Sequence, residues 1–240
     1  RILRMDRDTL HGKHALSKMH ERIRKHEVDI VIGTQLVTKG HDFPEVTLVG
    51  VIMSDLSLNI PDFRASERTF QLLTQVAGRA GRGHKPGEVL IQTHNPRHHS
   101  LLCAKEHNTA QFMELELERR LNLRMPPFHS LALIVCSSPH EERAEKMTQV
   151  IYERIRTLIS NTQRSTVMET VENDETAAVK VIGPIEAPMK KLRNRFRWQL
   201  LLKADNVRHL LHLLKHVFES SPSIKRDELL QIDVDPHHLL

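Results

Sequence analysis

Gln75–Arg82 reads QVAGRAGR, and this stretch decides how the rest of the chain is interpreted. Arg79 and Arg82 each follow a glycine. Arginine carries a fixed charge on a planar fork of donors, which suits the charge that develops on a transferred phosphoryl group. The glycines at 78 and 81 remove side chains that would block a close approach. Taken alone, the stretch is equally typical of a polar turn.

A second block, Gly33–Pro44, reads GTQLVTKGHDFP and precedes the first in the sequence. With both blocks present, a chance polar turn no longer explains the pattern. The two blocks resemble motifs V and VI of the superfamily 2 helicases. A longer pattern begins with DFRA at residues 62–65 and continues through Glu67 and Gln71 to Gln75–Arg82, which we call the arginine stretch. This pattern narrows the resemblance to the primosomal protein N′ family of bacterial replication-restart helicases.

This resemblance runs from Arg4 to Pro236 and therefore covers nearly the whole chain. It implies part of an ATP-dependent helicase that moves 3′→5′ on DNA, recognises and unwinds stalled replication forks, and promotes replication restart through primosome assembly. DNA, single-stranded DNA-binding protein and other primosome proteins are the implied partners.

Composition sets bounds on the chain. Its 240 residues, 39% of them hydrophobic, allow one large or two modest domains. Apolar runs such as Leu131–Cys136 are too short to cross a bilayer. The first residues carry no signal-peptide pattern and no initiator Met, and they open directly on a strand-like run, so we expect a fragment of a longer protein.

Cysteine usage and charge favour a cytoplasmic protein. Cys103 and Cys136 are isolated, so the sequence predicts neither a disulfide framework nor a zinc ribbon, and a reducing cytoplasm fits best. The net charge of +5 results from 35 basic and 30 acidic residues. Basic character therefore matters for nucleic acid only where it is clustered.

Residues 1–96 predict an α/β fold, namely part of a RecA-like second helicase lobe. Apolar runs predict buried strands of a parallel sheet, separated by helices, which puts ligand loops at the carboxyl ends of the strands. The expected strands are 2–5, 29–33, 47–53 and 88–93, and the expected helices are 15–26 and 65–76. Both motif blocks then lie at the ends of these elements.

Residues 97–126 predict a helical connector, one long helix or a helix pair that ends at Pro126-Pro127. Residues 127–240 predict a smaller α+β domain of βαββαβ order, the split βαβ arrangement. The expected elements are strand 131–136, helix 141–159, strand 178–182, strand 198–203, helix 207–218 and strand 229–234. The polar, acidic stretch 166–176 is typical of a mobile connection.

The resemblance implies catalytic roles for three residues of the arginine stretch. Arg82 would be the arginine finger and Arg79 its companion on the γ-phosphate, while Gln75 would orient the attacking water or link the nucleotide to the DNA side. The chain contains no GxxxxGK[ST] loop and no acidic magnesium-binding box. We therefore expect ATP with Mg²⁺ to bind jointly with a first lobe, and the chain alone to be inactive.

Further contacts to ATP and DNA are expected in the upstream block. Gly40 and Asp42, with Gly78 and the two arginines, are the candidate ATP contacts; Asp42 is alternatively a turn-capping residue. Thr34, Gln35 and Lys39 are candidate contacts to a DNA phosphate, which position a strand without reading its sequence. Thr34 is alternatively a structural cap, and the role of His41 stays open.

Lys190–Gln199 reads KKLRNRFRWQ and combines five basic residues with Phe196 and the single Trp. This mixture offers both phosphate charge and stacking faces. Strand alternation predicts Arg195, Arg197 and Gln199 on one face and the two aromatic residues on the other. The alternative is a solvated hairpin whose aromatic face is core. The candidate DNA contacts are Lys190, Lys191, Arg193 and Arg197.

The resemblance also implies that this domain binds branched DNA and the acidic tail of single-stranded DNA-binding protein. Arg195 and Gln199 are the candidates for the tail, because an Arg fork suits a carboxylate. The corner at Pro126–Phe128 is a further candidate aromatic contact. A rival interpretation is a non-catalytic module that docks DNA and single-stranded DNA-binding protein.

The histidines do not point to a metal site. His209, His212 and His216 share a helix face, but no Cys or acidic ligands accompany them at matching spacing. A metal-dependent enzyme is therefore a distant third interpretation. The resemblance implies zinc in the full-length protein, held by a cysteine-rich insertion and not by this chain.

Overall fold

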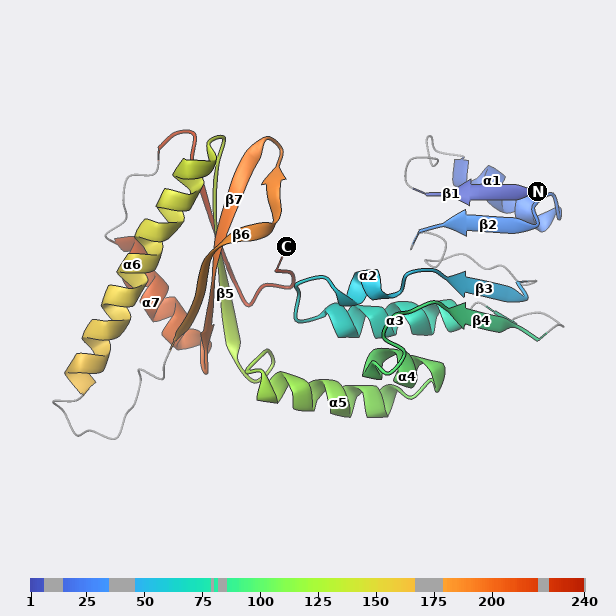
Figure 1. Cartoon of the computed structure of the whole chain (residues 1–240), viewed down its shortest axis with the longest axis horizontal. Coiled ribbons are helices and arrows are strands. Elements are labelled where there is room, and N and C mark those ends of the chain that lie inside the picture. The colour runs from blue at the N-terminus through green and yellow to red at the C-terminus, as the bar shows by residue number, and fades with distance from the viewer. Residues whose placement is uncertain are drawn as a thin grey trace. The chain divides into compact units, whose positions relative to one another are not determined.

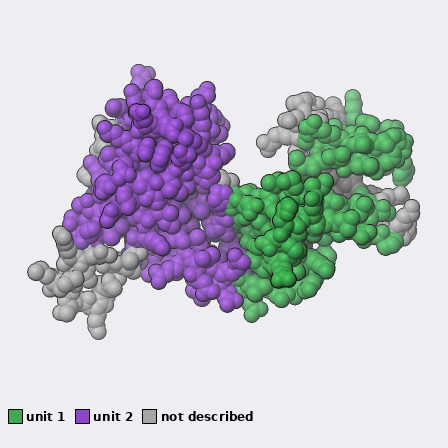
Figure 2. Space-filling model, viewed as in Figure 1, with its two compact units in different colours: residues 1–60, 64–115 green, residues 61–63, 116–240 purple. Residues whose placement is uncertain are grey.

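The computed structural model of the chain describes residues 1–6, 15–34, 46–78, 80–81, 86–166, 179–219 and 225–239. It shows a mixed α/β structure in two units, coloured separately in Figure 2. Unit 1 consists of residues 1–60 and 64–115, and unit 2 consists of residues 61–63 and 116–240. Among the described residues, the strands form two parallel pairs and one four-stranded sheet.

Unit 1 contains both parallel pairs. β1 (Ile2–Met5) pairs with β2 (Ile30–Gly33), and β3 (Leu48–Val51) pairs with β4 (Glu88–Ile91) (Figure 1). The predicted positions of these four strands are confirmed, although three of them are shorter than expected. The apolar, β-branched composition of the runs explains why they are extended.

The prediction that these strands are buried on both faces is wrong. In β2, Ile30 is 53% exposed and Ile32 is 54% exposed, and Leu48 and Leu90 also face solvent in the second pair. Leu3 and Met5 of β1 are buried, so only one face of the first pair is covered. Each pair is a half-covered sheet because nothing in the described part of the chain packs over its other face.

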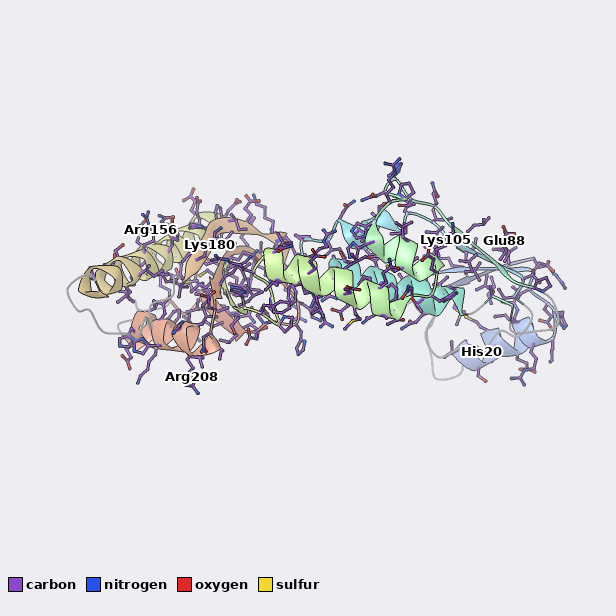
Figure 3. All side chains as sticks on the ribbon, turned by 90° about the horizontal axis from the view of Figure 1, so that it is seen from below. His20, Glu88, Lys105, Arg156, Lys180 and Arg208 are labelled. Carbon is purple, nitrogen blue, oxygen red and sulfur yellow. The ribbon has the colours of Figure 1, made fainter. Side chains whose placement is uncertain are left out.

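The helices of unit 1 are α1 (Ala15–Arg24), α2 (Asp55–Leu58), α3 (Ala65–Ala77) and α4 (His99–Lys105). Lys105, labelled in Figure 3, ends α4. Apolar side chains of α3 and α4 form the core of the unit, with Phe112 of the next helix stacked on Phe70 at a centroid distance of 4.1 Å. The short helix α2 was not predicted.

α5 (Thr109–Asn122) follows α4, so the predicted connector is a helix pair and not one long helix. The division between the two units falls inside α5, between Leu115 and Glu116. The domain boundaries expected from the sequence, at 96 and 126, stay a prediction.

Unit 2 has the element order βαββαβ. Its strands are β5 (Ser130–Ser138), β6 (Lys180–Leu192), β7 (Arg195–Ala204) and β8 (Leu229–Val234), and they form an antiparallel sheet of order β6-β7-β5-β8. This is the split βαβ order that the sequence predicts. Helices α6 (Glu141–Thr166) and α7 (Val207–Glu219) lie on one face of the sheet (Figure 1).

The main core of unit 2 lies between that face and the two helices. Alternate residues of β5 and β7 point toward the helices, as the period of two requires. Fully buried members include Ile134, Leu200, Leu202, Ile151, Ile155 and Leu210. Each such aliphatic side chain contributes about 2 kcal/mol when it leaves water, so this layer is the main source of the unit's stability.

The opposite face of the sheet is covered in part by two segments that are distant in the sequence. Leu133 and Val135 of β5 form a cluster with Leu239, and Phe63 packs against it. The carboxylate of Asp62 accepts a hydrogen bond from the Leu239 backbone N–H at 3.3 Å. Residues 61–63 are thereby part of unit 2, although they directly precede α3 of unit 1 in the sequence.

The predicted strand 178–182 is much too short, because β6 continues to Leu192. β6 contains Pro184 and Pro188, and proline cannot donate to a ladder. β6 tolerates them because it is the edge strand of the sheet and its pairing with β7 has two register shifts, after Ile182 and after Glu186.

Candidate functional site

The structure describes some of the predicted site residues and not others. The described ones are Thr34, Gln75, Gly78 and all of Lys190–Gln199, which we call the basic hairpin. The following predicted contacts lie outside the described residues: Gln35, Lys39, Gly40, His41, Asp42, Arg79 and Arg82.

The C-terminal end of α3 presents Gln75 and Gly78 to solvent. The buried face of this helix carries Phe70, Leu73 and Val76. Gln75 and Gly78 are three positions apart on the exposed face, and the Gly78 N–H closes the helix on the Thr74 backbone oxygen at 3.1 Å. The predicted position of the arginine stretch, where the helix ends and a connection to a strand begins, is confirmed.

A backbone hydrogen bond joins the arginine stretch to the segment that follows the upstream block. The Gly81 N–H donates to the Val46 backbone oxygen at 3.1 Å, and Val46 is two residues beyond Pro44. The next residue, Thr47, accepts from the Glu88 N–H at 2.8 Å. The arginine stretch therefore contacts the segment that follows the upstream block, although the two are far apart in the sequence.

This meeting point lies at the amino-terminal ends of β3 and β4. The described part of the arginine stretch lies in the predicted helix-to-strand connection, and such a connection enters the following strand at its amino end. Thr34 lies at the end of a strand, as expected, since it directly follows β2, and it is exposed. Its DNA contact stays a prediction.

Gly87 packs directly on the backbone of the arginine stretch. Gly81 has a φ of +75°, which favours glycine. A Cβ placed on Gly87 would lie 2.1 Å from the Gly81 nitrogen and 2.4 Å from the carbonyl carbon of Ala80. Sequence reasoning missed Gly87, although the dipeptide Pro86-Gly87 before an apolar run is a recognised turn signal.

Asp55 fixes the opposite ends of the same two strands, and it too was missed. Its carboxylate accepts from the His94 N–H and from the Thr93 hydroxyl, both at 2.8 Å. These two bonds, the backbone one first, lower the pKa of Asp55 below its ordinary value of 3.8. Asp55 follows β3 and its partners follow β4, so a charge-assisted contact holds the strand ends together.

The basic hairpin has a tight two-residue turn. Arg193 and Asn194 have φ values of +50° and +60°, as in the primed turns that match the twist of paired strands. Residues 190–192 end β6 and residues 195–199 begin β7, so both strands extend further toward the turn than the predicted strands 178–182 and 198–203. Lys191 lies opposite Phe196, with its Nζ 4.7 Å from the ring centroid, a cation–π contact.

Lys190 is held by two carboxylates. Its Nζ lies 2.7 Å from Glu141 and 2.8 Å from Glu186. The hydrogen bond to Glu141, followed by that to Glu186, raises the pKa of Lys190. A phosphate would have to compete with both acids, so the geometry favours Lys191 and Arg193, which are exposed, over Lys190 as DNA contacts.

Arg195, Arg197 and Gln199 share a face of β7, as the alternation predicts, but this face is not open. Arg197 is only 9% exposed and Gln199 is 7% exposed, whereas the aromatic residues beside them are half-buried. Within the described structure, three buried atoms here have no hydrogen-bond partner: Arg195 Nε, Arg197 Nη1 and Gln199 Oε1. The aromatic side is therefore not the more deeply buried one.

The histidines of α7 interact with one another. His216 Nδ1 lies 2.8 Å from the backbone oxygen of His212, and the two rings are 4.3 Å apart. In the described ranges, no group of three His, Cys, Asp or Glu residues is placed to hold a metal ion. Within the same ranges, no helix has the length and apolar character that a membrane crossing requires.

Comparison with known proteins gives the family. The profile of the family "Primosomal protein N C-terminal domain" matches residues 122–237, all of which lie in unit 2. The chain is also 38% identical, over 242 residues and its full length, to "Replication restart protein PriA" of Bacillus subtilis (strain 168). The chain belongs to the PriA family.

Two further relatives with the same name give the same result for this PriA-family chain. The protein of Synechocystis sp. is 38% identical over 98% of the chain, and that of Haemophilus influenzae is 34% identical over 99%. The chain spans 28%, 26% and 30% of the length of these three relatives. The predicted family membership is confirmed.

Proposed function

We propose that this chain is part of an ATP-dependent superfamily 2 DNA helicase that moves 3′→5′, unwinds stalled replication forks and promotes replication restart. The observation that carries the proposal is the hydrogen bond from Gly81, within the arginine stretch, to Val46, two residues beyond the upstream block, in a chain of the PriA family. A chance resemblance would give no reason for the arginine stretch to contact the segment that follows the upstream block.

In this proposal, unit 1 is part of a RecA-like second lobe that completes an ATP site with a phosphate-loop lobe. Arg82 is the arginine finger, Arg79 its companion, and Gln75 orients the attacking water; Gly40, Asp42 and Gly78 complete the contacts to ATP with Mg²⁺. ATP supplies the phosphoryl group whose developing charge these arginines would stabilise. The exposed position of Gln75 and Gly78 on one face of α3 supports the assignment.

DNA would be held at two places. Thr34, Gln35 and Lys39 would contact a backbone phosphate after β2, supported by the exposure of Thr34. On unit 2, the basic hairpin would contact DNA through Lys191 and Arg193. Lys190 and Arg197 are weaker candidates, because Lys190 is paired with Glu141 and Arg197 is buried. The platform of Lys191 on Phe196 combines a charge with a ring on which a base can stack.

Single-stranded DNA-binding protein would dock through its acidic tail on Arg195 and Gln199, and other primosome proteins are the remaining proposed partners. The unpartnered atoms Arg195 Nε and Gln199 Oε1 support a polar ligand at this face. A cytoplasmic location fits two cysteines that are both free and buried. Any zinc would belong to other parts of the full-length protein.

A second candidate is a non-catalytic module that docks DNA and single-stranded DNA-binding protein. The basic hairpin of unit 2 favours this second candidate. Strands β6 and β7 hold the basic side chains of the hairpin in place without any contribution from a nucleotide site. In that case unit 1 would serve only as a scaffold.

The two candidates differ in what Arg82→Ala does to the full-length polypeptide that carries these residues. A finger role predicts that kcat for DNA-stimulated ATP hydrolysis falls by about 10³-fold or more, while the affinity for single-stranded DNA changes little. A variant that hydrolyses ATP normally would favour the docking module. The chain alone should show no ATP turnover above a mock-purified control.

A further inference from the structure

Gly87 is outside both motif blocks, yet its backbone contacts the arginine stretch with no side chain between them. Ordinary contact of a Cβ begins near 3.4 Å, and one on Gly87 would meet the Gly81 nitrogen at 2.1 Å and the Ala80 Cβ at 2.7 Å. A Cβ on Gly81 would in turn lie 2.9 Å from the Gly87 nitrogen. The two glycines thus form a backbone-on-backbone contact, which we name the glycine clasp.

Both sides of the clasp are attached to the same short segment. Gly81 donates to Val46, and Glu88, the residue after Gly87, donates to Thr47. Glu88, labelled in Figure 3, also begins β4, whose pairing with β3 starts at the register Leu48↔Glu88. The clasp therefore fixes the positions at which the chain enters and leaves residues 82–86.

We propose that Gly87 is a positioning residue for the arginine finger. The clasp holds the backbones of Gly81 and Gly87 together, and Arg82 directly follows Gly81 in the sequence, so the clasp constrains the backbone from which Arg82 continues. This inference rests on the proposed function, since it needs Arg82 to act on the nucleotide. It adds a residue to that function that neither motif contains.

The expected effect follows from the size of the clash. A methyl group on Gly87 would force the two backbones apart by about 1 Å, and misplacement of a catalytic group by 1 Å costs about 10²-fold in rate. The contacted atoms are backbone atoms of Gly81 and Ala80, which cannot swing aside as the end of a side chain can. The loss should appear in kcat and not in the KM for ATP, because the finger acts on charge that develops in the transition state.

The test uses three variants of the full-length polypeptide that carries these residues. Gly87→Ala should lower kcat of DNA-stimulated ATP hydrolysis by about 10²-fold with KM for ATP within about threefold of wild type. Gly50→Ala is the matched control, because this glycine lies in β3 of the same unit and a Cβ on it meets nothing within 4 Å. Arg82→Ala is the reference for complete loss of the finger.

A second readout reports the clasp itself. Hydrogen exchange of the Gly81 amide should be slow in wild type and in Gly50→Ala, because this N–H is donated to Val46. It should be faster in Gly87→Ala, while the amides of β5 and β7 in unit 2 keep their protection. A change confined to Gly81 and its neighbours separates a moved clasp from an unfolded protein.

The outcomes distinguish a failure of the proposed function from a failure of the positioning role of Gly87. If Arg82→Ala hydrolyses ATP normally, the proposed function fails. If Arg82→Ala is inactive but Gly87→Ala matches Gly50→Ala in kcat, the positioning role is wrong. Should Gly87→Ala lose protection throughout unit 1, Gly81→Ala replaces it, because a Cβ on Gly81 meets the Gly87 nitrogen at 2.9 Å and disturbs the same contact more mildly. Full kcat in that variant would also overturn the role.

Discussion

The guanidinium of Arg195 donates from Nη2 to the backbone oxygen of Asp227 at 2.6 Å, across 32 positions of the sequence. The same nitrogen lies 3.3 Å from the Ser137 backbone oxygen, and the Asp227 carboxylate separately pairs with Arg143 at 2.6 Å. Arg195 therefore joins the start of β7, the end of β5 and the turn that precedes β8. A residue expected to bind a partner is also part of the structure of unit 2.

This double role predicts that Arg195→Ala lowers stability as well as binding. Loss of a charged donor from two backbone acceptors should destabilise unit 2 by about 2 kcal/mol. Affinity for an acidic peptide with a free C-terminal carboxylate should fall too, and Arg195→Lys should restore little of it because lysine lacks the bidentate fork. Thermal unfolding and a fluorescence titration measure the two effects.

Arg193→Ala is the matched control for that experiment. It removes the same charge from the turn tip, where Arg193 is exposed, and should leave the melting temperature unchanged. If Arg195→Ala and Arg193→Ala melt at the same temperature, the bonds to Asp227 and Ser137 contribute nothing to stability.

Phe63 provides a test of the contacts that make residues 61–63 part of unit 2. The ring packs on the cluster of Leu133, Val135 and Leu239, and the guanidinium of Arg120 lies 5.3 Å from its centroid. Because Phe63 is only half-buried, Phe63→Ala should cost about 2 kcal/mol, less than a fully buried Phe. Denaturant unfolding monitored by the fluorescence of Trp198 reports this unit. Phe128→Ala, at a ring that is 40% exposed, should cost far less; equal costs would contradict the assignment.

Local patterns in the sequence predicted much of the fold. β1 and β8 occur at the predicted residues, and α7 differs by one, because strong period-two or helical patterns lie between clear turn signals. The prediction missed most of β6, which contains two prolines, and the position of this strand at the sheet edge makes those prolines harmless. α2, with four residues, is too short to show a helical period.

In the candidate site, too, local patterns in the sequence predict some residues, whereas others depend on contacts that form only on folding. The placement of Gln75 and Gly78 at the end of α3 followed from periodicity and motif resemblance. Gly87 and Asp55 could not be found in this way, because each acts through neighbours that only folding brings close. Asp62 is the extreme case, since its partner Leu239 is 177 positions away.

Asp55 predicts an acid-dependent stability of unit 1. Hydrogen bonds from His94 and Thr93 lower its pKa in the folded state, so its contribution is fully present above the unfolded value and is lost as the pH falls through the lower folded value. Asp55→Asn should reduce the melting temperature at pH 7 and flatten its decline as the pH falls below the ordinary Asp value of 3.8. Parallel melting curves for both proteins over this range would contradict the role.

Cys136 predicts a thiol that resists modification. Burial raises its pKa to about 11, so almost no thiolate exists at pH 8. A thiol reagent at pH 8 should leave Cys136 unlabelled in the folded chain and label it in denaturant. The shift also means that stability is lost as the pH rises above the ordinary thiol value of 9.0, where the unfolded chain releases its proton first. Labelling at the unfolded rate would show that β5 is not buried as described.

The two neighbouring lysines of the hairpin should differ in DNA binding. Each phosphate contact releases condensed counterions, so the loss of one contact flattens the dependence of log affinity on log salt by about one unit. Lys191 is exposed above Phe196, whereas Lys190 is paired with Glu141 and Glu186. Lys191→Met should therefore weaken binding to single-stranded DNA and flatten the salt slope, and Lys190→Met should do so less.

Lys146→Met is the control, since this exposed lysine of α6 lies outside the hairpin and its removal changes the net charge equally. Fluorescence anisotropy over a salt series measures all three variants against wild type. A difference between Lys191→Met and Lys146→Met then reports a specific contact and not the overall charge. Equal losses of affinity and equal salt slopes for Lys190→Met and Lys191→Met would show that the ion pairs of Lys190 do not prevent it from binding DNA. Both lysines would then contact the DNA, as the sequence alone predicts.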